Sequence, residues 1–279
     1  MSKINNINRR KFLEIFGGCT CALMIPSCST APITDRKQLK LIPESTLNNQ
    51  AAQIYEKVKQ KTKLSDDKKK LDEIKEIGSR IEESVSAYFA SINKADPTRN
   101  FQWEYILVDN DKIKNAWCMP GGKIAVYTGI LEVTKNKHGL ASVMGHEIAH
   151  AVAKHSVERA SRALVLNVGT AALDVFTGGA AGQARQVFSE MTGQDILDIS
   201  VMKTHGRKQE SEADYMGMAF CSMSGYDLNE SVRLWKRMNE KNKGSEIPQF
   251  LSTHPSSVTR ILQIRGWIPE IKSKFPYSL

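Results

Sequence analysis

The residues best suited to chemistry form the segment His146-Glu147-Ile148-Ala149-His150. On a helix, side chains four residues apart lie on the same face, so both imidazoles can reach one metal ion. Glu147 projects beside them, where it can accept a proton from a water that the ion activates. The pattern predicts a zinc site with Glu147 as general base. The alternative is a chance motif on a structural helix.

A hydrolytic zinc site needs a third protein ligand and one open position for water or substrate. A histidine six residues after His150 would extend the motif, but Ser156 occupies that position. His155 is one residue short, and on a continuous helix it would point about 140° away from His150. We therefore expect His155 to be a packing or surface residue and not a ligand.

Glu210 is the better candidate for the third ligand. Glu210 and Asp214 are four residues apart, so a helix places both carboxylates on one face. One can bind the metal, and the other can hold a ligand histidine through its free N–H. Glu212 is expected on another face, in solvent. A carboxylate pair is usually surface decoration, but a two-histidine helix that lacks a third ligand favours the metal interpretation.

The elements that must position these residues are mostly helical, because apolar residues recur at intervals of three and four. We expect helices over residues 45–63, 65–93, 139–165, 206–224, 229–243 and 255–266. Strand patterns at 101–108, 113–119 and 123–128 predict a small sheet. The fold class is therefore mainly α with a small antiparallel β-sheet (α+β). The Gly-rich segment 166–203 fits a lid, a partner surface or a packed helix equally well.

Composition excludes several classes of protein. The chain has 279 residues, of which 41% are hydrophobic, and this is enough for a packed core. A formal charge of +9 would ordinarily suggest nucleic acid or an anionic membrane as a partner. The Lys and Glu runs alternate in sign along the expected helices, which is typical of solvated faces. We therefore expect no nucleic-acid partner.

Residues 1–27 have the pattern of an export signal, because basic residues precede a mostly apolar run. Arg9-Arg10 resembles a twin-arginine motif, although ordinary secretion stays open. The run Ile25-Pro26-Ser27-Cys28 resembles a lipobox, which predicts cleavage before Cys28 and lipidation of that residue. Cleavage would lower the formal charge from +9 to +6. Of the remaining cysteines, Cys118 and Cys221 either pair or stay as two separate buried thiols.

Several motifs together carry a family resemblance. His146-Glu147-x-x-His150, followed by Glu210-x-x-Ala213-Asp214, resembles the zinc metallopeptidases of the HtpX and CAAX prenyl protease superfamily, peptidase family M48. Blocks at 32–39, 115–124 and 252–255 are similar to the periplasmic lipoprotein branch that includes LoiP and BepA. The matching blocks extend over nearly the whole chain after the export signal.

The resemblance implies a gluzincin-like endopeptidase with one Zn²⁺ per chain, bound by His146, His150 and Glu210, and with Glu147 as general base. The family's His-Pro block corresponds to His254. This histidine would donate to the developing oxyanion or visit the open coordination site, with a helix-entry role as the alternative.

Two further groups of residues gain roles from the resemblance. Arg260 would orient Asp214 or bind the substrate backbone, and a surface ion pair is equally open. Asn115, Ala116 and Trp117 would lie on an edge strand whose backbone pairs with extended substrate, although an ordinary sheet strand has the same pattern. Unfolded or locally extended polypeptides are therefore the expected substrates.

The sequence thus predicts three regions: an export signal at 1–27, a lipidated tether at 28–43 and a zinc metallopeptidase domain at 44–279. We expect a periplasmic enzyme, lipid-anchored at the inner leaflet of the outer membrane, that degrades misfolded or misassembled envelope proteins. The alternative is a chaperone-like or partner-binding envelope protein with a closed or structural zinc site. Glu147 argues against that alternative, because a structural zinc site has no use for a general base.

Overall fold

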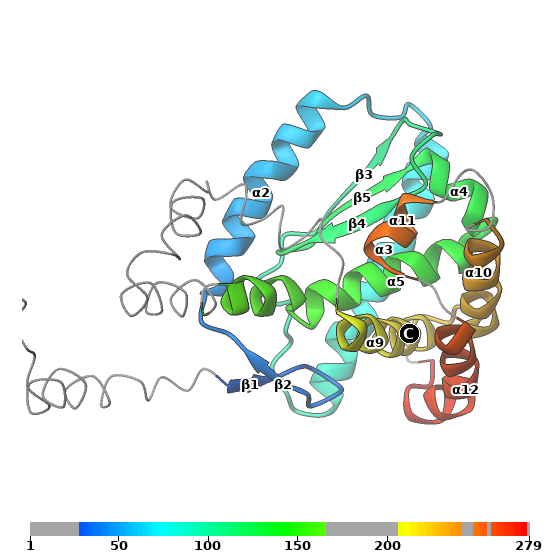
Figure 1. Cartoon of the computed structure of the whole chain (residues 1–279). Helices are drawn as coiled ribbons and strands as arrows, with labels where there is room; N and C mark the ends of the chain where they lie inside the picture. The colour runs from blue at the N-terminus through cyan, green and yellow to red at the C-terminus, as the bar shows by residue number, and fades with distance from the viewer. Residues whose placement is uncertain (1–27, 164, 166–205, 242–247, 256–257, 278–279) are drawn as a thin grey trace, which may run out of the picture.

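A computed structural model describes residues 28–163, 165, 206–241, 248–255 and 258–277 (Figure 1). Helices dominate these residues, and they surround two small sheets. The helices are α2 (Glu44–Lys61), α3 (Lys68–Ser91), α4 (Thr128–Thr134), α5 (Lys137–Val152), α9 (Arg207–Met223), α10 (Leu228–Lys241), α11 (Gln249–Thr253) and α12 (Val258–Lys274). The strands are β1 (Cys28–Thr30), β2 (Lys37–Leu39), β3 (Glu104–Val108), β4 (Ala116–Met119) and β5 (Lys123–Tyr127). The predicted fold class is confirmed. The segment 166–203 lies outside the described residues, so its three predicted roles stay open.

The central sheet differs from the prediction in one pairing. Its strand order is β3-β5-β4, with β4 antiparallel to β5 but β3 parallel to β5. Gly121 and Gly122, both with positive φ, form the tight turn that folds β4 back onto β5. Since β3 takes the other side of β5, it runs in the same direction as β5. The sheet is therefore mixed, and among the described strands β4 lies at its edge.

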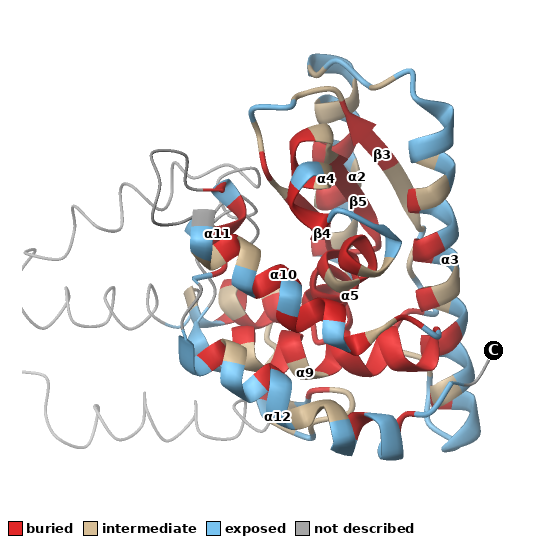
Figure 2. Ribbon diagram, turned by 90° about the vertical axis from the view of Figure 1, so that its right-hand side faces the viewer, coloured by how far each residue is buried: buried red, intermediate tan, exposed pale blue. Residues whose placement is uncertain are grey.

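Helix α5 carries the His146–His150 segment through the centre of the molecule, between the sheet and α9 (Figures 1 and 2). It crosses α9 where Gly145 meets Gly217. A Cβ atom at Gly217 would lie 2.8 Å from the backbone nitrogen of His146, so a larger residue there would push the helices apart. This close approach places the start of α9, with Glu210 and Asp214, opposite the two histidines.

The predicted long helix at 139–165 is interrupted. Helix α5 ends at Val152, a turn occupies 153–154, and a second helix begins at His155. Lys154 has a φ of 56°. Its ammonium donates to the Pro97 carbonyl at 2.8 Å and lies 3.0 Å from Glu44. These partners lie far away in the sequence, so tertiary contacts outweigh the local helical preference.

The expected tether is folded onto the domain over much of its length. Strands β1 and β2 form an antiparallel hairpin, with Ala31 and Gln38 buried. Gln38 donates to the Ala153 carbonyl, at the turn that ends α5. Cys28 is the first residue of β1, paired with Leu39. Attachment of a lipid at Cys28, and the boundaries of the three regions, remain predictions.

The described part of the chain answers two smaller questions. Cys118 and Cys221 are both buried and free, so they are two separate thiols. Within the described helices, none combines the length and apolar character that a membrane crossing requires.

Candidate active site

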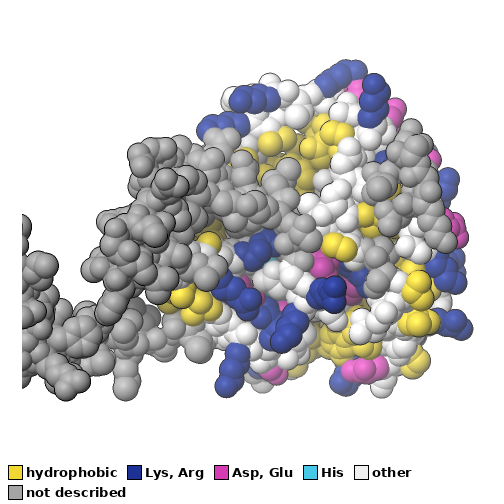
Figure 3. Space-filling view, viewed as in Figure 1, with side chains coloured by type: hydrophobic (Ala, Val, Ile, Leu, Met, Phe, Trp, Pro, Cys, Tyr) yellow, Lys and Arg dark blue, Asp and Glu magenta, His cyan; other side chains and the backbone are white. Residues whose placement is uncertain are grey.

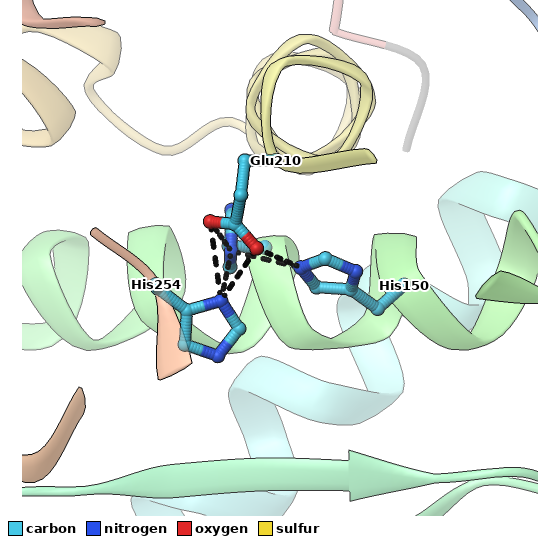
Figure 4. A group of neighbouring side chains, drawn as sticks. His150, Glu210 and His254 are labelled. Carbon is cyan, nitrogen blue, oxygen red and sulfur yellow. Dashed lines mark hydrogen bonds and ion pairs between the residues drawn. The ribbon is translucent and has the colours of Figure 1, made fainter. Parts of the chain in front are cut away.

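Four side chains converge at the centre of the molecule: His146 and His150 from α5, Glu210 from α9, and His254 directly after α11. Figure 4 labels three of them, His150, Glu210 and His254. All four are buried, and their ligand atoms lie within 4.8 Å of one another. The two histidine Nε2 atoms are 3.0 Å apart. Glu210 Oε1 lies 3.4 Å from His150 Nε2, and its Oε2 lies 3.6 Å from His146 Nε2. The structure thus brings together the three predicted ligands.

The network around these atoms fits a bound cation, starting with His146. His146 Nδ1 lies 3.0 Å from Asp214 Oδ1. Burial would raise the pKa of Asp214, but the Arg260 guanidinium outweighs it and keeps the pKa below the ordinary value. The carboxylate therefore accepts, Nδ1 carries the proton, and Nε2 of His146 presents a lone pair toward Glu210.

The same reasoning applies to His150. His155 Nε2 donates to the Glu212 carboxylate at 2.9 Å, which leaves His155 Nδ1 as an acceptor. His150 Nδ1, 2.7 Å away, then donates to it. Burial also lowers the pKa of His150 well below the ordinary value, so its Nε2 is unprotonated. Two imidazole lone pairs and a carboxylate thus face one another, an arrangement that suits Zn²⁺.

Asp214 and Arg260 support the site from behind His146. Arg260 Nε and Nη2 donate to the two Asp214 oxygens at 2.6 and 2.8 Å, and Nη1 lies 2.9 Å from Glu210 Oε2. Burial would lower the pKa of Arg260, but Asp214 and Glu210 raise it. Both residues are buried, so Arg260 forms a buried pair with Asp214 and not a surface ion pair.

Glu212 lies where the sequence did not place it, whereas His155 is a buried packing residue outside the donor group, as expected. Glu212 is buried and accepts from Thr34, from Arg36 Nε at 2.7 Å and from His155. The expectation that Glu212 is in solvent is wrong, and His155 belongs to the support of His150. His155 was expected to point about 140° away from His150, as it would on a continuous helix. That direction is wrong, because the turn at 153–154 brings His155 back to His150. The block at 32–39 was the only sequence signal pointing to Arg36.

Glu147 lies beside the ligands and faces strand β4. Its Oε1 is 3.2 Å from His254 Nε2, and its carboxylate accepts from the backbone N–H of Cys118. Burial raises the pKa of Glu147 above the ordinary value. A carboxylate with a raised pKa, next to the metal ligands, is suited to take up a proton near neutral pH.

His254 adds a fourth nitrogen to the group. Its Nδ1 lies 3.0 Å from Glu210 Oε1 and 3.1 Å from His146 Nε2, and its ring stacks on Phe250. Burial would lower the pKa of His254, but Glu147 and Glu210 outweigh it and raise the pKa. His254 would therefore be a fourth ligand, whereas a catalytic zinc site has three protein ligands and one open position.

The residues expected to bind substrate lie next to this group. Asn115, Ala116 and Trp117 line one pocket together with Glu147, His150 and His254. Side chains along β4 alternate between two hydrophobic clusters, with Ala116 in one and Trp117 in the other. A larger cavity of about 980 Å³ opens over Glu210, near the start of α9, where Figure 3 shows several Lys and Arg side chains on the surface.

Comparison with known proteins identifies the family. Residues 75–268 match peptidase family M48, and this is more than half of the chain. The chain belongs to peptidase family M48. It is accordingly a zinc metallopeptidase, as predicted, and its buried group of four donor side chains is able to hold a metal ion.

Relatives with curated names agree with this assignment. The mitochondrial metalloendopeptidase OMA1 of Schizosaccharomyces pombe is 36% identical over 68% of this chain and 54% of its own length. OMA1 of Saccharomyces cerevisiae is 28% identical over 96% of this chain and 77% of its own length. The beta-barrel assembly-enhancing protease of Escherichia coli is 28% identical over 59% of this chain and 34% of its own length. Much of the fission yeast and bacterial relatives therefore lies outside the aligned part.

The relatives correct the predicted location. A periplasmic protein, lipid-anchored at the outer membrane, was expected, but the two yeast relatives are mitochondrial proteins. The placement rested on residues 1–27, which are basic and then apolar. Basic N-terminal segments also occur in signals for other compartments, so this pattern does not distinguish among them. Membership of the lipoprotein branch stays a prediction.

Proposed function

We propose that this M48 peptidase is an endopeptidase that cleaves unfolded or misassembled polypeptides in an extended conformation. The observation that supports this most is the position of β4. It is the edge strand of the described sheet, and the backbone N–H of Cys118 on β4 reaches Glu147. An extended segment that pairs with the outer edge of β4 would pass directly over the metal ligands. Recognition through the backbone implies a loose sequence preference.

Each side chain of the site has a role in hydrolysis. His146, His150 and Glu210 would hold Zn²⁺, which would supply polarisation of the scissile carbonyl and a lowered pKa for the attacking water. Glu147 takes the proton from that water and passes it to the leaving amine. Asp214 keeps the His146 Nδ1 proton in place, so that Nε2 stays a metal ligand.

His254 has two roles in this proposal. If His254 were a fourth ligand, no position would be left for water or substrate, so hydrolysis would require the ring to move away. Once displaced, the ring can donate through an N–H to the developing oxyanion.

The test uses the purified chain loaded with zinc. We expect one zinc per chain and digestion of an unfolded protein such as casein, with loss of digestion after chelation. Glu147→Gln should retain zinc and lose activity by at least about a hundredfold, because it removes the proton acceptor and leaves the ligands. Equal digestion by both proteins, or activity without zinc, would overturn the proposal.

A second candidate function is favoured by the position of His254. Four protein donors around one ion make a closed site, which is typical of structural zinc. The chain would then bind extended polypeptides without cleaving them. This function predicts that the zinc-loaded protein suppresses aggregation of an unfolded protein, that Glu147→Gln does so equally well, and that neither protein releases peptides.

A further inference from the structure

One buried charge near the site is left without a partner. Arg159 lies on the helix that follows the turn at 153–154, nine residues after His150. All three of its guanidinium nitrogens are buried, and no residue in the described part of the chain forms a hydrogen bond with them. Buried polar groups are almost always hydrogen-bonded, so an exception calls for an explanation such as a role in binding.

Two other arginines near the site have the carboxylate partners that Arg159 lacks among the described residues. Arg260 contacts both Asp214 and Glu210, and Arg36 contacts both Glu158 and Glu212. Each of these guanidinium groups has two carboxylate partners. Arg159 has no carboxylate hydrogen-bond partner among the described residues.

The position of Arg159 points to the substrate. It lines the same pocket as Glu147, His150 and the edge-strand residues 115–118. A segment paired with β4 would therefore lie between Arg159 and the general base. Arg159 also lies close enough to His150 for its charge to lower the pKa of that histidine.

The surrounding charges indicate what Arg159 would bind. Burial lowers the pKa of Arg159 to about 10, opposed by the charges of Glu210, Glu147 and Glu158. Arg159 is thus still cationic at neutral pH. Those three carboxylates have other partners: Glu210 contacts Arg260 and His254, Glu158 contacts Arg36 and Arg162, and Glu147 contacts His254. A neutral carbonyl would leave the charge uncompensated, whereas a carboxylate matches the guanidinium in charge and in geometry.

We propose that Arg159 binds a carboxylate of the substrate and thereby selects acidic residues beside the scissile bond. This rests on the proposed endopeptidase function. The carboxylate comes from an Asp or Glu side chain or from a free C-terminus close to the cleavage site. The chemistry is the same in both cases, and peptides distinguish the two sources.

The experiment compares fluorogenic peptides that differ only in Glu or Gln on either side of the cleaved bond. We expect zinc-loaded wild type to cleave one Glu peptide at least about tenfold more efficiently, as kcat/KM, than its Gln counterpart. Arg159→Gln should cleave both at the rate of the wild type on the Gln peptide. Arg159→Glu should instead favour a peptide with Lys at that position. Peptides with a free or amidated C-terminus distinguish a side-chain carboxylate from a terminal one.

Arg162→Gln is the matched control, because Arg162 lies on the same helix but is 62% exposed and pairs with Glu158. It should keep the preference for Glu. A preference retained in Arg159→Gln, or absent from wild type, would overturn the proposal. So would strong destabilisation of Arg159→Gln on heating, since that would show a structural partner for the guanidinium.

A binding measurement keeps the two proposals separate. In the Glu147→Gln background, fluorescence anisotropy should show tighter binding of the Glu peptide, and adding Arg159→Gln should abolish the difference. If this variant pair behaves as expected while wild type cleaves nothing, Arg159 binds carboxylates and the proposed activity fails. If wild type cleaves peptides but binding does not depend on Arg159, the activity holds and the assignment of Arg159 is wrong.

Discussion

The two histidine ligands of α5 are supported in different ways. His146 is backed by Asp214 and Arg260, which are both buried and belong to helices α9 and α12 of the core. His150 is backed by His155 and Glu212, and the chain of contacts then continues to Arg36 on the N-terminal hairpin. The first support is short and internal. The second passes through a segment that precedes the M48 match at 75–268.

The proton on Nδ1 of each histidine is therefore held in place by different residues. The support of His146 fixes the proton on Nδ1 through a single carboxylate that Arg260 holds in a bidentate pair. The support of His150 fixes its proton through a histidine and a carboxylate, and it depends on whether the hairpin stays docked. We therefore expect the contacts that support His146 to contribute more to zinc affinity than those that support His150. We also expect zinc affinity to respond, through His150, to substitutions far from the metal.

The largest effect is expected from Asp214→Asn. The substitution removes the charge that orients His146 and leaves Arg260 to compete for Glu210. We expect zinc affinity to fall about 10- to 100-fold. The free energy of unfolding of the zinc-free protein should fall by about 3 kcal/mol, since the Arg260 guanidinium loses its buried partner. Chelator competition and urea unfolding measure the two effects.

Asp109→Asn is the matched control for this substitution. Asp109 pairs with the exposed Lys63 and lines neither of the two cavities at the site. It should change the free energy of unfolding by less than about 1 kcal/mol and leave zinc affinity unchanged. If Asp214→Asn binds zinc as tightly as this control, the proposed role of Asp214 is wrong.

Glu212→Gln should have the next largest effect. It removes the acceptor that keeps His155 in the tautomer His150 needs, so we expect about tenfold weaker zinc binding. Glu230→Gln is the matched control, because Glu230 is also buried and also contacts two arginines, Arg233 and Arg237. The two variants should lose similar stability, and only Glu212→Gln should lose zinc affinity. Equal zinc affinities would mean that the His155–Glu212 chain supports the fold alone.

Arg36→Gln tests whether the hairpin takes part. Arg36 connects Glu212 with Glu158, and its removal leaves Glu212 with Thr34 and His155 as partners. We expect zinc affinity to fall by less than about tenfold, since the change is one step further from the metal. Arg233→Gln is the control, because Arg233 also bridges two carboxylates but on α10. Zinc affinity unchanged in both variants would show that the hairpin only covers the domain.

The two supports also differ in how far the sequence predicted them. His146, His150, Glu210 and Asp214 follow from helical spacing, because each pair is four residues apart on one helix. The His155–Glu212 contact could not be predicted, because it depends on the turn at 153–154. That turn is held by Lys154, whose partners Glu44 and Pro97 belong to distant parts of the chain. The parallel pairing of β3 with β5 likewise depends on which side of β5 remains free.

The smallest effect is expected from Glu158, the second carboxylate that Arg36 contacts. Burial would raise the pKa of Glu158, but Arg36 and Gln209 outweigh it and hold the pKa at about 2, below the ordinary 4.5. A carboxylate with a lowered pKa in the folded state stabilises the protein above pH 4.5, and this stability is lost as pH falls toward 2. Wild type should therefore be more stable than Glu158→Gln at pH 7, and the difference should narrow below pH 4.5.

Urea unfolding of zinc-free protein at a series of pH values measures this difference without interference from metal binding. The same Glu158→Gln substitution should change zinc affinity at pH 7 by less than Arg36→Gln does, because Arg36 can still contact Glu212. A constant stability difference down to pH 3 would show that Glu158 is not held ionised by the hairpin. A larger loss of zinc affinity in Glu158→Gln than in Glu212→Gln would contradict the order of contacts from Arg36 to His150.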